Sequence, residues 1–288
     1  MSDRIIRATA AGAMIRAFVA DTKDIVQTAF DHHKTYPVIT AALGRTLTAA
    51  TIMGVMQKSE KDVITLKIDG NGPAGNIVVT ADCKGNVKGY AGNPHVDIPL
   101  KPNGKLDVSG AVGQGTLTVI KDMGLKEPYV GTTELVSGEI GEDLTYYFTA
   151  SEQIPSSVGL GVLVDKDYSI KQAGGFIIQL MPFATDDVID KLEENLSKIT
   201  SVTNLFESGN SLEEILGILL EGMDIEILDE ITPRFVCECS RQKVRDAISL
   251  IKKDEIKSMI EDGEPVEVHC DFCNTYYTFE VEELKELL

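Results

Sequence analysis

The spacing of apolar residues changes along the chain, and each change predicts a different kind of structure. Near the start, a short helix is predicted over Asp21–Phe30 and a longer one over Pro37–Gln57, because proline suits a first helical position. From Asp62 the apolar residues occupy every second position, which predicts a half-buried strand that ends at the turn Gly70-Asn71-Gly72-Pro73. The helical spacing of the longer helix is carried by Val38, Leu43, Leu47, Ala50 and Met53.

More strands are predicted downstream, separated by glycine-rich turns. Two of them, Val158–Val164 and Ser169–Leu180, are expected to form a hairpin around Asp165-Lys166-Asp167. Because the strands are grouped together after the helices, the predicted fold class is α+β with an antiparallel sheet. The other predicted strands are Asn76–Ala81, Val87–Tyr90, Thr116–Lys121, Tyr129–Val136 and Leu144–Phe148.

The helical pattern returns after Pro182. One helix is predicted from Thr185 to about Thr200 and another over Leu212–Leu220, where Ser211 and Glu214 match a capping box. Two interpretations of these helices stay open. Their apolar faces fit a helical extension packed permanently on the first domain. They also fit a metastable linker that docks and releases, because each interior glycine weakens a helix by roughly 1 kcal/mol and neighbouring carboxylates repel one another.

The net charge of −18 is concentrated toward the C-terminus. Residues 1–178 carry 17 basic and 19 acidic side chains, residues 179–288 carry 10 and 26, and 21 of the 25 glycines precede residue 179, which predicts a domain boundary there. So acidic a chain argues against nucleic acid or an anionic membrane surface as a partner. No uninterrupted apolar run approaches the ~18–20 residues of a membrane span, and the N-terminus does not resemble a secretory signal, so the protein is predicted to be soluble and intracellular.

Four of the five cysteines lie in the last 52 residues, and they form two close pairs, Cys237-x-Cys239 and Cys270-x-x-Cys273. In a reducing cytosol such pairs more often bind metal or carry out redox chemistry than form permanent disulfides. Two pairs separated by a short folded insert can supply the four thiolates of a tetrahedral zinc site. The insert is predicted to hold helices up to Gly263 and then a short strand at Pro265–His269.

The one-residue gap between Cys237 and Cys239 is unusual for a structural zinc site. A disulfide between these two sulfurs would close a small strained ring that is easily reduced again, which hints that the cysteines change redox state. His269 could replace a ligand, but four cysteines suffice, so it is interpreted as a strand residue or a neighbour of the site. The isolated Cys83 is interpreted as a bystander thiol.

Other chemistry is sparse. His32 and His33 lie at a predicted helix end, where a charge effect on the helix terminus is a simpler interpretation than a catalytic base. The segment Gly70–Gly75 lacks the lysine and the following helix of a phosphate-binding loop, so a β-turn is predicted. No nucleotide-binding or serine-hydrolase motif is present, so neither use of ATP nor an enzymatic activity is predicted.

The cysteine layout, with Phe272 inside the second pair and Asn274-Thr275-Tyr276-Tyr277 after it, resembles the redox-regulated heat-shock chaperones of about thirty-three kilodaltons. Further landmarks of that family match at Asp69–Pro73, Glu152–Val162 and Gly174–Pro182, so the resemblance runs along the whole chain. It implies an α+β core (residues 1–178), a helical metastable linker (179–232) and a small zinc-binding redox-switch domain (233–288).

The same resemblance implies a function, a cofactor and partners. The expected protein is a cytoplasmic, ATP-independent holdase that is inactive while Cys237, Cys239, Cys270 and Cys273 bind zinc. Oxidation would form the disulfides Cys237–Cys239 and Cys270–Cys273 and release the metal. The zinc domain would then unfold, the linker would loosen, and the monomer would become a homodimer that binds unfolded client proteins.

Three other classes of protein remain as alternatives. A thiol-disulfide oxidoreductase could use Cys270 and Cys273, although the surrounding sequence lacks a thioredoxin-like βαβ pattern. A zinc ribbon for nucleic acid is disfavoured by the local negative charge. A passive zinc-stabilised scaffold would differ from a chaperone in that oxidation changes only its stability.

Overall fold

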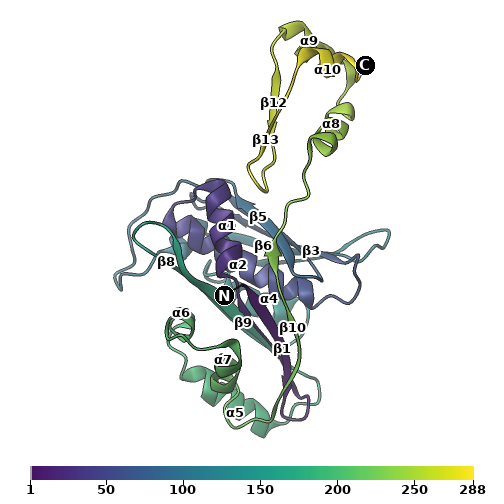
Figure 1. Cartoon of the computed structure of the whole chain (residues 1–288). Helices are drawn as coiled ribbons and strands as arrows, with labels where there is room; N and C mark the ends of the chain where they lie inside the picture. Colours follow the sequence, from purple (N-terminus) through teal and green to yellow (C-terminus); the bar gives the residue numbers. More distant parts are fainter. Residues whose placement is uncertain (1) are drawn as a thin grey trace. The chain divides into compact units, whose positions relative to one another are not determined.

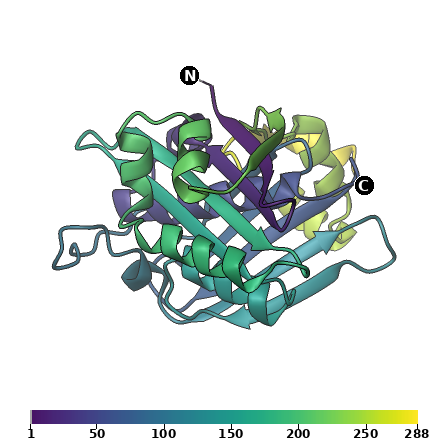
Figure 2. The ribbon, with the colours of Figure 1, turned by 90° about the horizontal axis from the view of Figure 1, so that it is seen from below.

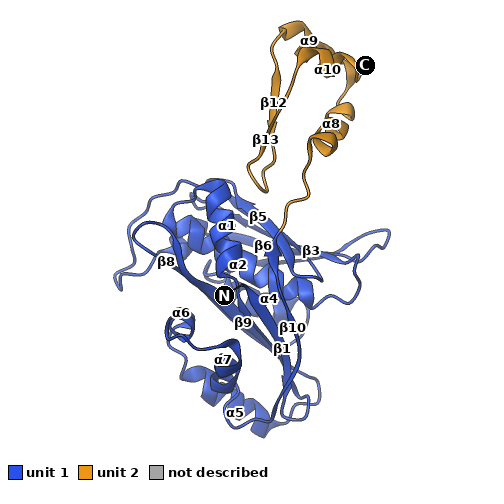
Figure 3. Cartoon of the chain, in the orientation of Figure 1, with its two compact units in different colours: residues 1–235 blue, residues 236–288 orange. Residues whose placement is uncertain are grey.

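Two sheets pack against the long helix α2 (Pro37–Val55) in the first of two units, which span residues 1–235 and 236–288 (Figures 1 and 3). The structure is a computed structural model that describes residues 2–288. One sheet has the strand order β10-β1-β2-β9-β8, and the other has the order β11-β5-β4-β3-β6-β7. The strands are β1 Arg4–Ala10, β2 Ile15–Asp21, β3 Val63–Gly70, β4 Asn76–Asp82, β5 Asn86–Ala91, β6 Gly115–Asp122, β7 Tyr129–Glu134, β8 Ser156–Val164, β9 Ile170–Leu180, β10 Ile225–Ile231 and β11 Arg234–Phe235.

Helix α2 is the centre of this unit. All of its residues except Pro37 and Arg45 are buried, and its threonine hydroxyls hydrogen-bond to carbonyl groups one turn back, at Thr46, Thr48 and Thr51. By length and mean hydropathy α2 could cross a membrane, although no uninterrupted apolar run signals this in the sequence. The fold buries 94% of its apolar window, so α2 is a core helix.

Most elements predicted between residues 21 and 180 are confirmed to within a few residues, including the β8–β9 hairpin. The strand predicted at Leu144–Phe148 is wrong, because these residues belong to helix α4 (Gly141–Ala150). Leu144, Tyr147 and Phe148 have helical spacing and are all buried, and the Asp143 carboxylate accepts backbone N–H groups at the start of the helix. Tertiary packing therefore overrides the strand preference of threonine, tyrosine and phenylalanine. The remaining helices of this part are α1 (Lys23–His33) and α3 (Val108–Val112).

Three short helices cover the second face of the five-stranded sheet: α5 (Asp186–Ser197), α6 (Val202–Glu207) and α7 (Leu212–Leu219) (Figure 2). The predicted capping box is confirmed, since the Ser211 hydroxyl accepts the N–H of Glu214 and the Glu214 carboxylate accepts the N–H of Ser211. The helices bury leucines against a set of sheet residues that we call the linker face: Ile6, Ala8, Ala10, Ile15, Ala17, Val19, Phe176 and Ile178.

The chain then returns to the sheets instead of continuing as helix. Strand β10 pairs antiparallel with β1 along the edge of the five-stranded sheet, and β11 pairs parallel with β5 in the other sheet. The sequence pattern did not predict β1, β2 or β10. Residues 225–235 therefore join the edges of both sheets.

The second unit contains three helices and one hairpin. Its core is small: only Ile248, Ile256, Phe279 and Leu284 are buried apolar residues of its main cluster. Gly263 ends α9 in a left-handed conformation (φ 73°), as expected for a residue that stops a helix. The elements are α8 Arg241–Ser249, α9 Lys253–Asp262, β12 Val266–His269, β13 Tyr276–Phe279 and α10 Val281–Lys285.

Candidate metal centre

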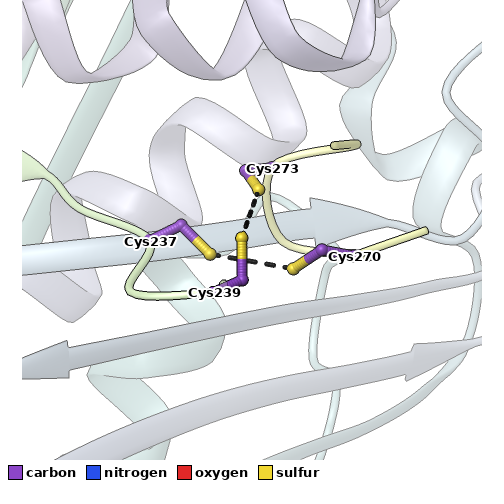
Figure 4. Close-up of side chains that lie close together, drawn as sticks. All are labelled: Cys237, Cys239, Cys270 and Cys273. Carbon is purple, nitrogen blue, oxygen red and sulfur yellow. Dashed lines mark hydrogen bonds between the residues drawn. The ribbon is translucent and has the colours of Figure 1, made fainter. Parts of the chain in front are cut away.

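The two cysteine pairs of the second unit meet in space (Figure 4). The four Sγ atoms all lie within 4.8 Å of one another. Two contacts join the pairs: Cys237 Sγ lies 3.7 Å from Cys270 Sγ, and Cys239 Sγ lies 3.2 Å from Cys273 Sγ. Thirty residues, 240–269, separate the pairs in sequence, so the fold of this unit is what brings the sulfurs together.

The turn between β12 and β13 positions the second pair. The N–H groups of Cys273 and Asn274 both donate to the carbonyl of Cys270, and the N–H of Cys270 donates to the carbonyl of Thr275. Asn274 adopts a left-handed conformation (φ 53°), which asparagine tolerates better than most residues. The first pair lies on an extended segment that ends at Ser240, whose hydroxyl caps helix α8.

Two hydroxyl groups that the sequence analysis named only as part of the family motif contact the sulfurs. The Tyr277 hydroxyl donates to Cys239 Sγ at 3.1 Å, and the Thr275 hydroxyl lies 3.2 Å from Cys273 Sγ. Thr275 and Tyr277 are two residues apart in extended chain, so their side chains point to the same face of the hairpin. The period-two spacing after Cys273 is the signal that could have identified them.

The protein surroundings change the thiol pKa values in opposite directions. Burial raises the pKa of Cys237 to about 12 and also raises the pKa of Cys270. Burial acts in the same sense on Cys273, but hydrogen bonds from Thr275 and Cys239 outweigh it and lower the pKa of Cys273 to about 7. Because a metal binds thiolates, its binding at this cluster would displace the protons of the remaining thiols.

The donor set fits zinc. A tetrahedral site with Zn–S bonds of ~2.3 Å has sulfur–sulfur edges of about 3.8 Å, and the observed separations bracket that value. Four soft thiolates with no carboxylate among them favour zinc over magnesium or calcium. His269 is not part of the cluster: its Nε2 lies 3.0 Å from the Asp271 carboxylate, and its ring stacks on Tyr276.

Cys83, His32 and His33 belong to the first unit, whereas the four clustered cysteines belong to the second. Cys83 is half-buried in the turn between β4 and β5, where burial raises the pKa of its thiol. His32 and His33 occupy the last turn of α1, as predicted, and the ring of His32 packs near Phe235. None of these residues joins the cysteine cluster.

The family model described as Hsp33 protein matches residues 3–280, which is nearly the whole chain. This chain belongs to the Hsp33 family. It is 57% identical to the 33 kDa chaperonin of Agathobacter rectalis over the full length of both proteins, and 52% identical to that of Clostridium tetani, covering 100% of this chain and 98% of the relative.

A solved structure agrees with this assignment to Hsp33. The crystal structure of the 33 kDa chaperonin (heat shock protein 33 homolog) from Thermotoga maritima has a TM-score of 0.93 and 36% sequence identity, covering 100% of this chain and 98% of that one. The family resemblance inferred from the sequence motifs and the predicted α+β fold class are therefore confirmed.

Proposed function

We propose that this member of the Hsp33 family is a redox-regulated, ATP-independent chaperone that holds unfolding proteins and prevents their aggregation. It would be inactive while reduced and zinc-bound, and active once its cysteines form disulfides and release the metal. The observation that carries the proposal is the convergence of four sulfurs within 4.8 Å in a unit with a small apolar core. Family membership supports the broader statement that the protein is a chaperone.

Zinc would stabilise the second unit more than its apolar core does. Domains this small are marginal when burial alone holds them together, and only four apolar residues of the main cluster are fully enclosed. Structural zinc bound by thiolates contributes ~10–16 kcal/mol of apparent folding free energy. Loss of zinc from Cys237, Cys239, Cys270 and Cys273 should therefore unfold residues 236–288.

The pairing of the disulfides decides whether oxidation can unfold this unit. Disulfides across the pairs, Cys237–Cys270 and Cys239–Cys273, would close loops of more than 30 residues and would stabilise the fold by about 3–4 kcal/mol. Disulfides within the pairs, Cys237–Cys239 and Cys270–Cys273, constrain almost none of the chain. The resemblance to the family implies this pairing within the pairs, and we propose it here, because it would remove zinc and leave the segment free to unfold.

Release of the linker would then create the client-binding surface. We propose that residues 179–232 act as the metastable linker, even though α5, α6, α7 and β10 are packed in the structure. Their departure would uncover the apolar residues of the linker face together with the buried leucines of α7. Exposed apolar patches of this kind bind unfolded chains.

The proposal also covers the cellular location, the oligomeric state and the binding partners of the protein. We propose a cytoplasmic protein that is a monomer when reduced and a homodimer when oxidised, with unfolded or partly folded proteins as clients. The charge of −18 supports clients over nucleic acid or anionic membranes as partners.

The test measures zinc content and suppression of client aggregation in the same samples before and after treatment with hypochlorous acid. The expected result is one zinc and no suppression before treatment, and no zinc with strong suppression afterwards. A Cys83→Ser variant is the control and should respond like the wild type. Equal suppression in both states would exclude redox regulation, and zinc loss without suppression would favour a zinc-stabilised scaffold.

A further inference from the structure

Tyr277 contacts two parts of the second unit at once. Its ring packs against the apolar cluster of this unit, whose buried members include Ile256 and Phe279. Its hydroxyl donates a hydrogen bond to Cys239 Sγ at 3.1 Å. One side chain therefore connects the apolar core of the unit with the sulfur cluster.

The same hydrogen bond joins two segments that are distant in the chain. Tyr277 lies in β13, the strand that follows the second cysteine pair, whereas Cys239 belongs to the first pair, 38 residues earlier. Strand β13 is held by β12, with Tyr277 in register with Val268. The hairpin that carries Cys270 and Cys273 therefore also supplies a donor to a sulfur of the first pair.

Cys239 depends on side-chain contacts because its own segment has no regular structure. Residues 236–240 form neither helix nor strand, and they connect the two-residue strand β11 to helix α8. The Sγ of Cys239 lies 3.2 Å from Cys273 Sγ and accepts the Tyr277 hydrogen bond. Of these two contacts, the one with Tyr277 comes from a residue outside the set of four sulfurs.

A phenol hydroxyl suits a thiolate that binds a metal. The thiolate is negatively charged, so a hydrogen bond to it is stronger than one between two neutral groups. Neighbours of this kind orient metal ligands, and their loss commonly weakens metal binding by roughly 10–100-fold. The bond also withdraws electron density from the sulfur, which makes it a weaker nucleophile toward an oxidant.

Tyr276, the preceding residue, lies on the opposite face of the hairpin, because successive residues of a strand point to opposite sides. Its side chain is 58% exposed, and its ring stacks on His269. The two tyrosines are adjacent in one strand, and the hydroxyl of Tyr277 is the one that reaches Cys239. Tyr276 therefore provides a matched comparison for the loss of a hydroxyl group.

We propose that Tyr277 is a positioning residue of the redox switch, whose hydroxyl holds Cys239 at the metal and sets how readily zinc is released. The inference rests on the proposed zinc-bound, redox-regulated function and adds a residue that sets its threshold. In the oxidation, two thiolates of a pair give two electrons to one hypochlorous acid molecule, and the products are one disulfide, one chloride and one hydroxide. Without the Tyr277 hydroxyl, Cys239 Sγ leaves the metal more often and reacts at a lower dose of oxidant.

Two single-atom variants of the full-length protein test this role. Tyr277→Phe removes the hydroxyl and keeps the ring in the apolar cluster, and Tyr276→Phe is the matched control. In competition with a chromogenic chelator, Tyr277→Phe should bind zinc roughly ten- to a hundredfold more weakly than the wild type, whereas Tyr276→Phe should bind it equally well. On stepwise addition of hypochlorous acid, Tyr277→Phe should lose zinc and begin to suppress client aggregation at a lower dose.

Cobalt(II) in place of zinc reports on the sulfur atoms themselves. Thiolates bound to cobalt(II) absorb light by charge transfer from sulfur to metal, and a hydrogen bond to the sulfur raises the energy of that transition. At saturating cobalt(II), the band of Tyr277→Phe should therefore lie at longer wavelength than the bands of the wild type and Tyr276→Phe. Ile256→Val loosens the apolar core of the same unit, so it should weaken metal binding without moving the band.

The outcomes separate this role from simple packing and from the general function. An unchanged zinc affinity and an unmoved band in Tyr277→Phe would overturn the inference. Weaker binding with an unmoved band, as expected for Ile256→Val, would also overturn it, because Tyr277 would then act only through packing. A wild type that binds zinc but never suppresses aggregation would contradict the chaperone function and leave the role of Tyr277 at the metal intact. A wild type that binds no zinc would overturn both proposals.

Discussion

At Cys273, two features of the β12–β13 turn and one residue of the first cysteine pair act on a single sulfur atom. The turn fixes its backbone through the carbonyl of Cys270, the Thr275 hydroxyl lies 3.2 Å from its Sγ, and Cys239 Sγ lies at the same distance. These contacts hold the pKa of Cys273 well below that of Cys237. Individual thiols within one site therefore have different chemical surroundings, and each is best tested separately.

Replacing one of the four cysteines should remove the metal. Cys270→Ser leaves three thiolates and a weakly coordinating hydroxyl, so native mass spectrometry should find the zinc lost and the second unit unfolded. Cys83→Ser, in the first unit, should keep one zinc per chain. Full retention of zinc by a variant lacking both Cys237 and Cys270 would contradict the ligand assignment.

The ion-pair network of Glu139 predicts a pH effect on stability. Burial alone would raise the pKa of this carboxyl, but hydrogen bonds from Lys101 and Arg45, the latter at 2.7 Å, lower it to about 2 from an ordinary value of 4.5. Because the folded pKa lies below the unfolded one, the stabilisation is complete above about pH 4.5 and is lost as the pH falls toward 2.

Glu139→Gln should therefore lower the free energy of unfolding of the first unit by roughly 1–3 kcal/mol at neutral pH. The wild type loses stability as the pH falls from 4.5 to 2, and the Glu139→Gln variant should lose less over the same range, because it lacks the titrating carboxyl. Chemical denaturation at a series of pH values measures both effects. Glu142→Gln, an exposed glutamate in the first turn of α4, is the control, and an identical pH profile for wild type and Glu139→Gln would contradict the prediction.

At the scale of elements, α7 offers the sharpest test of the linker. Leu216 is 1% exposed against the linker face, whereas Ile218 on the same helix is 40% exposed. Leu216→Glu would bury a charge at a cost of several kcal/mol, a large share of the ~5–15 kcal/mol that stabilises a domain.

The Leu216→Glu variant should keep its zinc, become sensitive to protease within residues 184–231 and suppress client aggregation while still reduced. Ile218→Glu introduces the same charge at an exposed position and should behave like the wild type. A Leu216→Glu variant whose linker is cleaved readily but which remains inactive would place the client surface elsewhere.

The turn that holds the second cysteine pair also predicts the order of oxidation. Two intervening residues allow a less strained disulfide than one, so Cys270–Cys273 should form at least as early as Cys237–Cys239. Quenching the reaction at intervals and mapping the peptides by mass gives the order directly. Early accumulation of Cys237–Cys239 alone would show that local reactivity outweighs ring strain.

Local sequence signals predicted the helices and strands better than they predicted which strands pair with one another. The alternation in β3 to β6 and the capping box at Ser211 depend on residues close in sequence, and both predictions are confirmed. The prediction for residues 144–148 was wrong, because burial of Tyr147 and Phe148 in the core of the first unit outweighs their strand preference. Strand β10 was not predicted, because it is held by pairing with β1, more than 200 residues earlier in the chain.

At the scale of the whole molecule, the family resemblance and the fold class followed from residues spread over the full chain. The spacing of the cysteines implied a metal site, and the fold brings their sulfurs within bonding range of one ion. The sulfur contacts of Thr275 and Tyr277, and the order of the strands in each sheet, depend on three-dimensional pairing. Periodicity alone carries no information on which strand ends a sheet.

The strands β10 and β11 have a further consequence for the time course of activation. Each lies at the edge of a different sheet, and β11 pairs through only two residues, Arg234 and Phe235. An edge strand can separate from its neighbour one hydrogen bond at a time, starting from a free end. Once the C-terminal unit loses its structure, fraying should therefore start at Phe235, pass through β10, and then reach α7, α6 and finally α5. Partial oxidation would then yield a series of intermediates with progressively shorter attached linkers.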